Sequence, residues 1–442
     1  MSKCDVLSLE LYSLGRDIDI VEPVLIYLEY KYSLKIARAP GEDYGYYLLK
    51  YRPKLLLISN SVGSTYKTEA VKLASLLGIK VVSLVSEGQD NCKAFDSDET
   101  LSDFYWGTNK EKKLYEDLNL VWNDMMYGLA SKILSKCDIN RIKISGATLM
   151  DKYFILRNTC SRKEFFKKNA LNQYNKIILI TTWSFSLLYG EYYLRNANTI
   201  CGLLGGEEYV EFHKKNAIAV RKIYEHIIKN NKDILFIIKI HPAELDNDEG
   251  DATKSEYYGL DRYENVYMVP PYTDSILDLL SISDMLLSYE STTAMEAWLL
   301  EKPAIFVNPE TEKFPRNDFY KGVVINKNAQ EVMSSLKEFY NEGHIKEFDI
   351  KEKERKHINA VVMKYADGKN HIRAANMIIE ILKNKRKKKH INLWVLFKLL
   401  KGCIRKVMGI KRCNYNHKER VQYSNKYREA LLKFYDKYGV QL

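Results

Sequence analysis

Short apolar runs alternate with segments of helical period along the first third of the chain. Residues 66–77 (YKTEAVKLASLL) place apolar side chains at helical spacing and end at Gly78, a residue that commonly closes a helix. Strands that alternate with helices predict a parallel sheet covered by helices on both faces. The runs expected to be strands are residues 5–9, 34–37, 54–59 and 79–85, with a further helix at 20–32.

The same alternation starts again in the second part of the chain. Residues 176–182 (KIILITT) and 234–240 (ILFIIKI) are apolar runs of the kind found in buried parallel strands. At 442 residues the chain exceeds one average domain, so we expect two α/β domains, at residues 1–155 and 156–382. Further elements expected in the second domain are a long amphipathic helix at 210–230 and strands at 265–269, 285–288 and 304–307.

Polar residues stand where two strands of the second predicted domain end. His241 and Pro242 follow one strand, and Ser291, Thr292 and Thr293 follow another at the start of a helix. Ligands of an open α/β sheet bind at the carboxyl ends of strands, and a helix start offers N–H groups that suit a phosphate. Taken separately, the hydroxyls also fit a simple N-cap and the histidine an ordinary loop residue. Their joint placement at two strand ends predicts one phosphate-binding site.

A polar turn also follows the third expected strand of the first domain. Ser61, Gly63 and Ser64 lie just before the helix at 66–77. Their backbone N–H groups would be presented to an acceptor or a phosphate, although the same residues fit a capped turn. The turn lacks the glycine pattern of known nucleotide-binding loops, so both interpretations stay open.

A carboxylate follows the fourth expected strand of the first domain. Glu87 lies next to Gly88, and a carboxylate beside glycine can approach a substrate hydroxyl and accept its proton. A base of this kind can activate a hydroxyl group for attack on a substrate. Glu87 is also consistent with a solvated loop carboxylate, and Asp90 is the neighbouring substitute.

The positive charge of the chain is concentrated at its C-terminal end. The net charge is +11, but residues 381–442 hold 18 Lys/Arg and 3 Asp/Glu, or +15, which leaves −4 for the rest. Residues 383–389 (KNKRKKK) carry six cations and lead into 393–408, where apolar side chains share a helical face bordered by Lys and Arg. Such a helix suits the surface of an anionic bilayer. We therefore expect residues 383–442 to form a basic amphipathic tail that contacts a membrane through 383–412.

A partner protein is the alternative target of this tail. Nucleic acid is not expected as a partner, because the interleaved Leu, Phe and Trp side chains suit lipid better than phosphate. The chain shows no secretory signal and no apolar run of transmembrane length, and its seven cysteines are dispersed without metal-binding spacing. We expect a cytoplasmic protein on the inner face of the cell membrane.

Two stretches carry a family resemblance. IIKIHPAE, followed some fifty residues later by SYESTTAMEAWLLEKPAIFV, resembles the C-terminal half of bacterial GT-B enzymes of surface-polysaccharide assembly. These include polysialyltransferases, capsule Kdo transferases, "surface carbohydrate biosynthesis" proteins and, more distantly, polyol-phosphate polymerases. In the sialyl and Kdo branches the resemblance implies a doubly acidic motif ending in glycine, where this chain has Ser86 before Glu87-Gly88. The polymerases have His-Gly at that place, so the chain departs from both.

The resemblance implies a GT-B fold, in which two Rossmann-like domains face each other across a cleft, here with a basic helical tail. It implies that a His-Pro motif and a Ser/Thr pair hold the phosphate of a CMP-sugar, without a metal or a cofactor. The expected catalytic residues are Glu87 and His241, with donor binding by Lys239, Pro242, Tyr272, Ser291, Thr292, Thr293 and Glu296, and acceptor binding by Ser61, Gly63, Ser64 and Gly88. Tyr272 is expected beside the nucleobase, and Glu296 fits either ribose or the first turn of its helix.

The predicted function is inverting transfer of a sugar from a nucleotide donor, most directly CMP-linked, to a glycan or lipid-linked glycan. Transfer of a polyol phosphate from a CDP donor is a second hypothesis, against which the missing His-Gly counts. UDP-sugar transfer or 2-epimerisation is a third. A catalytically silent scaffold that binds glycan is the alternative outside enzymes.

Overall fold

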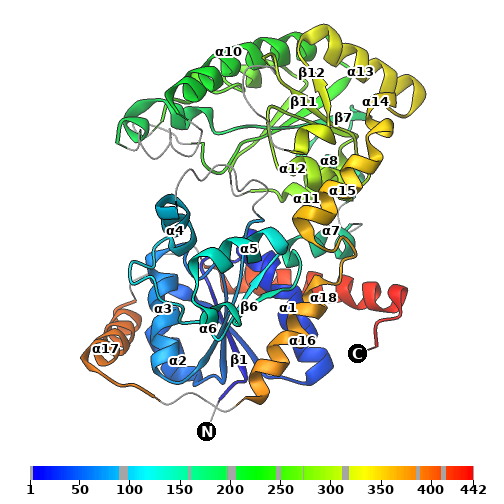
Figure 1. The fold of residues 1–442 in the computed structure, drawn as a ribbon. Coiled ribbons are helices and arrows are strands. Elements are labelled where there is room, and N and C mark those ends of the chain that lie inside the picture. The colour runs from blue at the N-terminus through cyan, green and yellow to red at the C-terminus, as the bar shows by residue number, and fades with distance from the viewer. Residues whose placement is uncertain are drawn as a thin grey trace. The chain divides into compact units, whose positions relative to one another are not determined.

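The chain folds into two compact α/β units in a computed structural model (Figure 1). The structure describes residues 3–88, 98–157, 161–195, 197, 206–244, 250–271, 273–310, 318–384, 389–409 and 415–441. The first unit combines Met1–Leu156 with Ala360–Leu442, and the second consists of Arg157–Asn359.

The first unit contains a six-stranded parallel sheet of order β2-β1-β3-β4-β5-β6. Every residue of the central strand β3 is buried, because helices cover both faces of the sheet. The strands predicted at 5–9, 54–59 and 79–85 are confirmed to within one residue. The strands are β1 (Val6–Glu10), β2 (Ile36–Pro40), β3 (Leu55–Ser59), β4 (Lys80–Leu84), β5 (Leu118–Val121) and β6 (Ile142–Ile144).

The helices of the first unit come from both ends of the chain. Those from the N-terminal part are α1 (Arg16–Tyr32), α2 (Tyr44–Tyr51), α3 (Thr65–Leu76), α4 (Asp98–Trp106), α5 (Asp124–Ile133), α6 (Lys136–Ile139) and α7 (Lys152–Ile155). Those from the C-terminal part are α16 (Asn370–Lys383), α17 (Leu393–Val407) and α18 (His417–Tyr438). Helix α15 (Glu352–Met363) carries the chain back from the second unit to the first.

The second unit contains another six-stranded parallel sheet, of order β12-β11-β10-β7-β8-β9. Strands predicted from the apolar runs are confirmed here as well. The strands are β7 (Lys176–Thr181), β8 (Ile234–Lys239), β9 (Val266–Val269), β10 (Met285–Ser288), β11 (Ala304–Val307) and β12 (Val324–Asn326). The helices are α8 (Arg162–Asn169), α10 (Glu207–Asn230), α11 (Ile276–Ile282), α12 (Thr293–Leu299), α13 (Ala329–Glu342) and α14 (Lys346–Ile350).

The second predicted domain ends earlier than expected, because residues 360–382 belong to the first unit. Helix α16 packs against α1, and the buried His371 at its start holds it there. His371 Nδ1 lies 2.7 Å from Asp151 Oδ2, and its Nε2 lies 2.9 Å from the hydroxyl of Tyr435. These contacts tie together three segments that are distant in the sequence.

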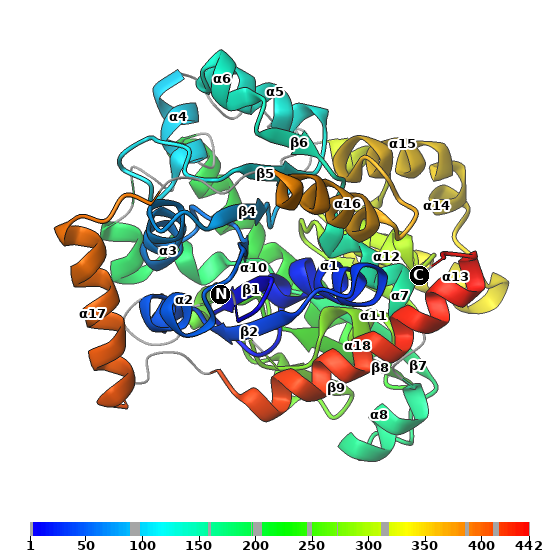
Figure 2. The same cartoon turned by 90° about the horizontal axis from the view of Figure 1, so that it is seen from below.

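The C-terminal region differs from the single membrane-contacting tail that the sequence predicted. Helix α18 lies along α1 and contributes core residues, among them Tyr427, Leu431 and Tyr435 (Figure 2). Helix α17 lies beside α2, and only its outward face is exposed. The tail is therefore largely an integral part of the first unit. None of the described helices is both long enough and apolar enough to cross a bilayer.

Candidate active site

The strand order of the second sheet reverses at β7. The chain runs from β7 through β8 to β9, then returns to the other side of β7 for β10, β11 and β12. In an open α/β sheet the connections on the two sides of such a reversal diverge, and ligands bind there at the carboxyl ends of the strands. The segments after β7, β8 and β10 therefore lie at one edge of the sheet, at its ligand-binding position.

His241 is placed at this edge by the end of β8. Its backbone N–H donates to Thr182 Oγ1 at 2.8 Å, and its Nδ1 lies 2.9 Å from Ser184 Oγ. The backbone N–H of Ala243 donates to the same Nδ1 at 3.1 Å, so this nitrogen is an acceptor. In the neutral ring the proton then belongs to Nε2, which is the nitrogen able to donate to a ligand.

Lys239 joins the ends of β8 and β9. Its ammonium donates to the carbonyl oxygen of Pro270 at 2.7 Å. Burial lowers the pKa of Lys239, and the nearby carboxylate of Asp274 opposes this shift. The predicted neighbour Pro242 is exposed beside His241. Tyr272, expected at the nucleobase, lies outside the described residues.

The three predicted hydroxyl residues follow β10 and lead into α12. Ser291 Oγ donates to Thr293 Oγ1 at 2.9 Å and accepts from the backbone N–H of Thr293 at 3.2 Å. Thr292 precedes the helix, and its side chain makes no capping hydrogen bond. Glu296 is half-buried in the first turn of α12. The alternative of a simple N-cap therefore accounts for part of the hydrogen bonding of Ser291. It does not account for Thr292.

An aromatic cluster that the sequence did not predict packs beside these residues. The indole of Trp183, after β7, stacks on the ring of His213 with centroids 4.6 Å apart and an interplanar angle of 15°. His213 Nδ1 lies 3.0 Å from the hydroxyl of the buried Tyr289, the first residue after β10. His213 is itself buried in α10. Its position one turn after the apolar Val210 and one turn before Ala217 was the available signal.

Two carboxyl groups, one fully and one partly buried, support the same loops. Glu256 is fully buried, and one of its oxygens accepts from the backbone N–H of Trp183 at 2.5 Å. Glu244 accepts from Ser255 Oγ at 2.8 Å, and its backbone N–H donates to the carbonyl of His241 at 2.9 Å. Burial raises the pKa of Glu256 well above the ordinary value, and the charge of Glu244 raises it further. Both residues lie in irregular segments, where no sequence pattern marked them.

In the first unit, Glu87 is exposed and forms an ion pair with Arg16. Gly88 packs closely against the side chain of Trp122, since a Cβ added to it would lie 2.3 Å from Trp122 Cε3. Close packing therefore explains this glycine without a ligand. Asp90, the substitute for Glu87, lies outside the described residues.

The polar turn before α3 is held by contacts within it. The backbone N–H of Gly63 donates to the carbonyl of Asn60 at 3.1 Å, and Thr68 Oγ1 donates to the carbonyl of Ser61 at 3.2 Å. Ser64 stands at the N-cap position of α3 with an extended backbone, and its hydroxyl makes no capping hydrogen bond. The buried Lys67, unpredicted from the sequence, donates to Asp17 Oδ2 at 2.6 Å.

No group of three or more His, Cys, Asp or Glu side chains in the described part of the chain is arranged to hold a metal ion. The candidate active site consists of imidazole, hydroxyl, ammonium and backbone groups at the edge of the second sheet.

Comparisons with known proteins show the fold. No protein-family model matches the chain, and no curated protein matches it in sequence. A putative UDP-N-acetylglucosamine 2-epimerase from Listeria monocytogenes is similar in structure, with a TM-score of 0.52 and 14% identity over 88% of this chain and 100% of that one. The wall teichoic acid polymerase TagF is similar with a TM-score of 0.52 and 13% identity, over 87% and 90% of the two chains. The S. aureus MnaA-UDP co-structure is similar with a TM-score of 0.50 and 14% identity, over 88% and 100%. With its two six-stranded parallel sheets flanked by helices, the chain has the GT-B fold.

Proposed function

We propose that this protein transfers a sugar from a nucleotide donor to a growing bacterial surface glycan. The observation that carries the proposal is the placement of His241, Ser184 and the 291–293 hydroxyls after three adjacent strands, where the sheet order reverses. An imidazole and several hydroxyls at that position suit the phosphate of a leaving nucleotide. A CMP-linked donor is preferred, on the resemblance of the IHPAE and SYESTTAMEAW stretches to the sialyl and Kdo transferases.

The proposed reaction is a single displacement at the anomeric carbon of the donor sugar. The acceptor oxygen forms the new glycosidic bond as the bond to the phosphate oxygen breaks, and Glu87 takes the proton of the acceptor hydroxyl. His241 donates from Nε2 to the departing phosphate, while Lys239 adds positive charge and Ser291, Thr292 and Thr293 supply hydroxyls. Donors fixed before the reaction are suited to this task, because they need no reorganisation as charge develops.

The remaining predicted residues are assigned to binding. Pro242 and Tyr272 would contact the nucleoside and Glu296 the ribose. Ser61, Gly63, Ser64 and Gly88 would contact the acceptor. These assignments need no metal and no cofactor.

Donor turnover tests the proposal. The full chain is incubated with CMP-sialic acid, CMP-Kdo, UDP-N-acetylglucosamine and CDP-glycerol, and released nucleotide or epimerised sugar is measured for wild type, His241→Ala and Glu87→Gln. His226→Ala, which changes an exposed histidine on α10, is the matched control. We expect CMP release that His241→Ala reduces at least about a hundredfold and His226→Ala leaves unchanged.

Other outcomes separate the alternatives. Turnover of UDP-N-acetylglucosamine alone would favour 2-epimerisation or UDP-sugar transfer, and turnover of CDP-glycerol alone would favour polyol-phosphate transfer. The similarity in fold to UDP-N-acetylglucosamine 2-epimerases and to TagF, for which a structure soaked with CDPG exists, is the reason to include both donors. Absence of turnover with every donor would favour a glycan-binding scaffold.

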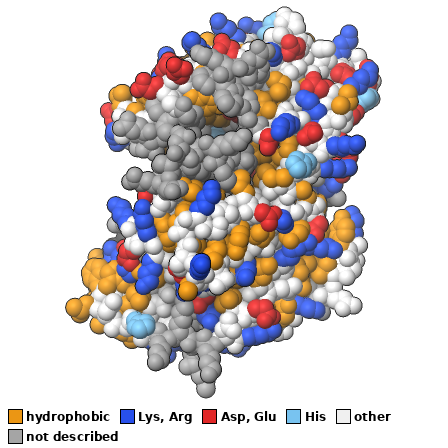
Figure 3. Space-filling model, viewed as in Figure 1, with side chains coloured by type: hydrophobic (Ala, Val, Ile, Leu, Met, Phe, Trp, Pro, Cys, Tyr) orange, Lys and Arg blue, Asp and Glu red, His pale blue; other side chains and the backbone are white. Residues whose placement is uncertain are grey.

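We also propose that the enzyme contacts an anionic membrane through residues 383–412. The outward face of α17 carries large exposed apolar side chains, and hydrophobic residues gather over this helix on the surface (Figure 3). They are Leu393, Leu396, Phe397, Leu400, Ile404, Val407 and Met408, with exposed fractions between 48% and 87%. The six cations of 383–389 lead directly into this face, whereas residues 1–380 have a net charge of −4.

Three of the four cations of α17 contact the first unit, while Lys401 is exposed. Lys398 pairs with Glu69, and Arg405 lies 3.7 Å from Glu42. Lys406 donates to the hydroxyl of Tyr47 at 3.0 Å. These groups hold the helix to the first unit, so the basic segment before α17 is the main source of attraction to anionic lipid.

Vesicle flotation tests the membrane contact. Wild type is expected to float with phosphatidylcholine vesicles containing phosphatidylglycerol. Phe397→Glu/Leu400→Glu should bind at least about tenfold more weakly, because two apolar side chains no longer enter the bilayer. The control Ile350→Glu/Val361→Glu changes two exposed apolar residues elsewhere. Equal binding by all three proteins would contradict this part of the proposal.

A further inference from the structure

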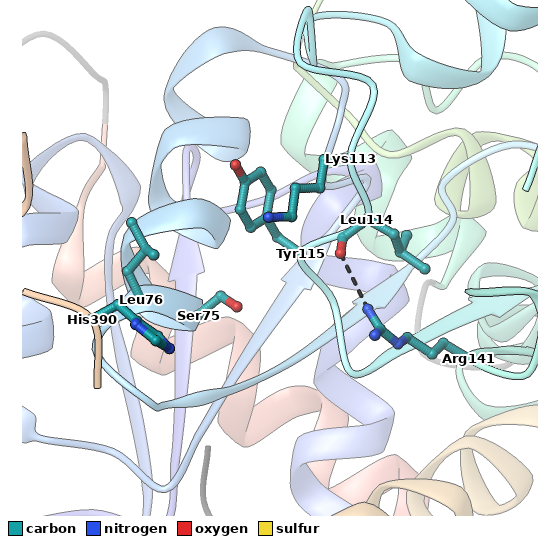
Figure 4. Close-up of a pocket in the computed structure, with 7 residues that line it drawn as sticks. All are labelled: Ser75, Leu76, Lys113, Leu114, Tyr115, Arg141 and His390. Atoms are coloured by element: carbon teal, nitrogen blue, oxygen red, sulfur yellow. Dashed lines mark hydrogen bonds between the residues drawn. The ribbon is translucent and has the colours of Figure 1, made fainter. Parts of the chain in front are cut away.

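A cavity of about 340 Å³ opens in the first unit at the amino-terminal edge of the sheet, away from the predicted strand-end loops. Ser75 at the end of α3, Lys113 and Tyr115 before β5, and Arg141 before β6 line it. His390, from the segment between α16 and α17, closes one side (Figure 4). Neither the predicted chemistry nor the described site uses this cavity.

The lining is rich in groups that bind an anion. Lys113 is exposed, and its ammonium lies 5.4 Å from the centre of the Tyr115 ring. Arg141 Nη1 donates to the carbonyl of Leu114 at 3.2 Å, and the same nitrogen lies 3.5 Å from Asp138 Oδ1. Since a guanidinium has five N–H donors, these contacts leave it capacity for a ligand. The lining thus holds two cations and an imidazole. Two carboxylates partly neutralise this charge: Asp138 beside Arg141, and Glu111, which accepts from the hydroxyl of Tyr115 and lies near Lys113.

The cavity is joined to the surface of α17 by the chain itself. The backbone N–H of His390 donates to the carbonyl of Leu76 at 2.8 Å, which fixes the segment at the cavity wall. The six cations of 383–389 precede this point, and α17 begins three residues after it. Trp394 and the buried Val395 of α17 pack in the same apolar cluster as Tyr115. The cavity therefore lies beside the first turn of the exposed apolar face.

We propose that this cavity binds the phosphodiester headgroup of an anionic phospholipid while the outward face of α17 enters the acyl region. Lys113, Arg141 and His390 would contact the phosphate, and Ser75 offers a hydroxyl to it. This inference rests on the membrane contact proposed above and is independent of the transferase chemistry. It adds a specific headgroup site to what would otherwise be a general electrostatic attraction.

Two measurements on the full chain test the site. Calorimetry uses dihexanoyl phosphatidylglycerol below its micelle concentration, with inorganic phosphate as the second probe. Flotation uses phosphatidylcholine vesicles containing either phosphatidylglycerol or an equal charge of oleate, which carries no phosphate. The variants are Lys113→Gln/Arg141→Gln, each single substitution, and the control Lys132→Gln/Lys433→Gln, which removes two exposed lysines elsewhere in the first unit. Thermal unfolding of each variant confirms that it is folded.

We expect wild type to bind the short-chain lipid and to prefer phosphatidylglycerol vesicles to oleate vesicles. Each cation removed from the cavity should weaken lipid binding about fivefold, and the control should bind as wild type does. The variant Phe397→Glu/Leu400→Glu should still bind the short-chain lipid but should no longer bind the vesicles.

Equal binding by cavity variants and wild type would overturn the proposal, as would equal preference for oleate. Inorganic phosphate that binds as tightly as the short-chain lipid would assign the cavity to free phosphate and overturn the lipid assignment. Donor turnover by Lys113→Gln/Arg141→Gln should equal that of wild type. Failure of the transferase proposal would appear as absent turnover in all proteins, with lipid binding unaffected.

Discussion

Ser184 Oγ lies 2.9 Å from Nδ1 of His241, so a residue after β7 contacts the candidate catalytic ring after β8. The backbone N–H of Ala243 donates to the same nitrogen, and Thr182 Oγ1 accepts from the backbone N–H of His241. The ring is thus held from two neighbouring strand ends, with Nε2 as the donating nitrogen. Ser184 is a positioning residue in this arrangement.

Ser184→Ala should lower donor turnover about five- to tenfold, since the substitution removes one hydrogen bond of about 1 kcal/mol. The decrease should appear in kcat more than in KM, because the ring would be less well oriented toward the leaving group rather than absent. Ser184→Thr keeps the hydroxyl and should restore most of the activity. Ser281→Ala, which removes a hydroxyl from α11, is the control. Identical kcat values for Ser184→Ala and wild type would contradict the positioning role.

Glu256 should make the stability of the protein depend on pH. Burial raises the pKa of Glu256 well above the ordinary value of 4.5, and the charge of Glu244 raises it further. The positive charge of Arg221 opposes this shift, and the hydroxyl of Tyr224 also lies nearby. The folded state therefore binds a proton that the unfolded state has released. Stability should fall as pH rises from 4.5 toward the folded pKa, by at most about 1.4 kcal/mol per pH unit.

Glu256→Gln should remove this dependence, because the amide is neutral and its oxygen can still accept from Trp183 N–H. Denaturant unfolding of both proteins between pH 5 and pH 8 measures the difference, which should grow with pH in favour of the variant. Parallel stability curves would show that Glu256 does not take up a proton on folding. Glu310→Gln, which changes an exposed loop carboxylate, should leave the curve unchanged.

The strands were predictable from the sequence because buried parallel strands are continuous apolar runs. Residues 234–240 could hardly form anything else between a helix and a His-Pro pair, and β8 occupies 234–239. Parallel strands bring their carboxyl ends to one edge of a sheet. The sequence pattern therefore also predicted that the segments of His241 and Ser291 lie at the same edge, on either side of the end of β7. The carboxyl groups of Glu244 and Glu256 were not predicted, since irregular segments leave no periodic signal.

The C-terminal region shows a second limit of prediction from sequence pattern, which is the choice of partner for an amphipathic helix. The spacing of apolar residues in an amphipathic helix is the same whether its apolar face contacts lipid or protein. Helix α17 has apolar side chains both on the face that packs on the first unit and on the exposed face. For α18 the decisive partners are far away: Arg420 and Glu10 are 410 positions apart in the chain. No local feature of a basic helix reveals that one of its arginines is buried.

Gly402 should be required for the docking of α17. A Cβ at this position would lie 2.7 Å from the backbone nitrogen of Tyr46, and one at Gly45 would lie 2.6 Å from the carbonyl of Lys398. The two glycines let α2 and α17 approach closely. Gly402→Ala should cost about 1–3 kcal/mol in overpacking and should expose the basic residues of α17 to trypsin.

Gly128→Ala is the matched control for this change, because a Cβ there meets nothing within 4 Å in α5. Limited proteolysis and hydrogen exchange of residues 393–407 measure the effect. Unchanged protection of α17 in Gly402→Ala would show that the neighbouring backbone moves to accommodate the methyl group.

Removal of the Arg420 side chain should strongly destabilise the first unit. Its side chain is 1% exposed, and the guanidinium donates to Glu10 at 2.7 Å and 2.8 Å and also pairs with Glu22. Glu22 keeps Arg38 as a second partner at 3.0 Å, whereas Arg420 is the ion-pair partner of Glu10 among the described residues. Arg420→Met would thus leave the buried carboxylate of Glu10 without its cation, at a cost of about 3–5 kcal/mol.

The double variant Arg420→Met/Glu10→Gln separates the loss of the pair from the cost of an unpaired charge. It should recover most of the stability, because two neutral side chains of similar size replace a desolvated pair.

Acid unfolding gives a second readout. Burial alone would raise the pKa of Glu22, but the charges of Arg38 and Arg420 outweigh burial and lower this pKa to about 2. The stability from Glu22 is complete above 4.5 and is lost as pH falls toward 2, so Arg420→Met should unfold at a higher pH than wild type. A cost below about 1 kcal/mol, with unchanged acid unfolding, would mean that α18 is held by its apolar contacts with α1 and not by this pair.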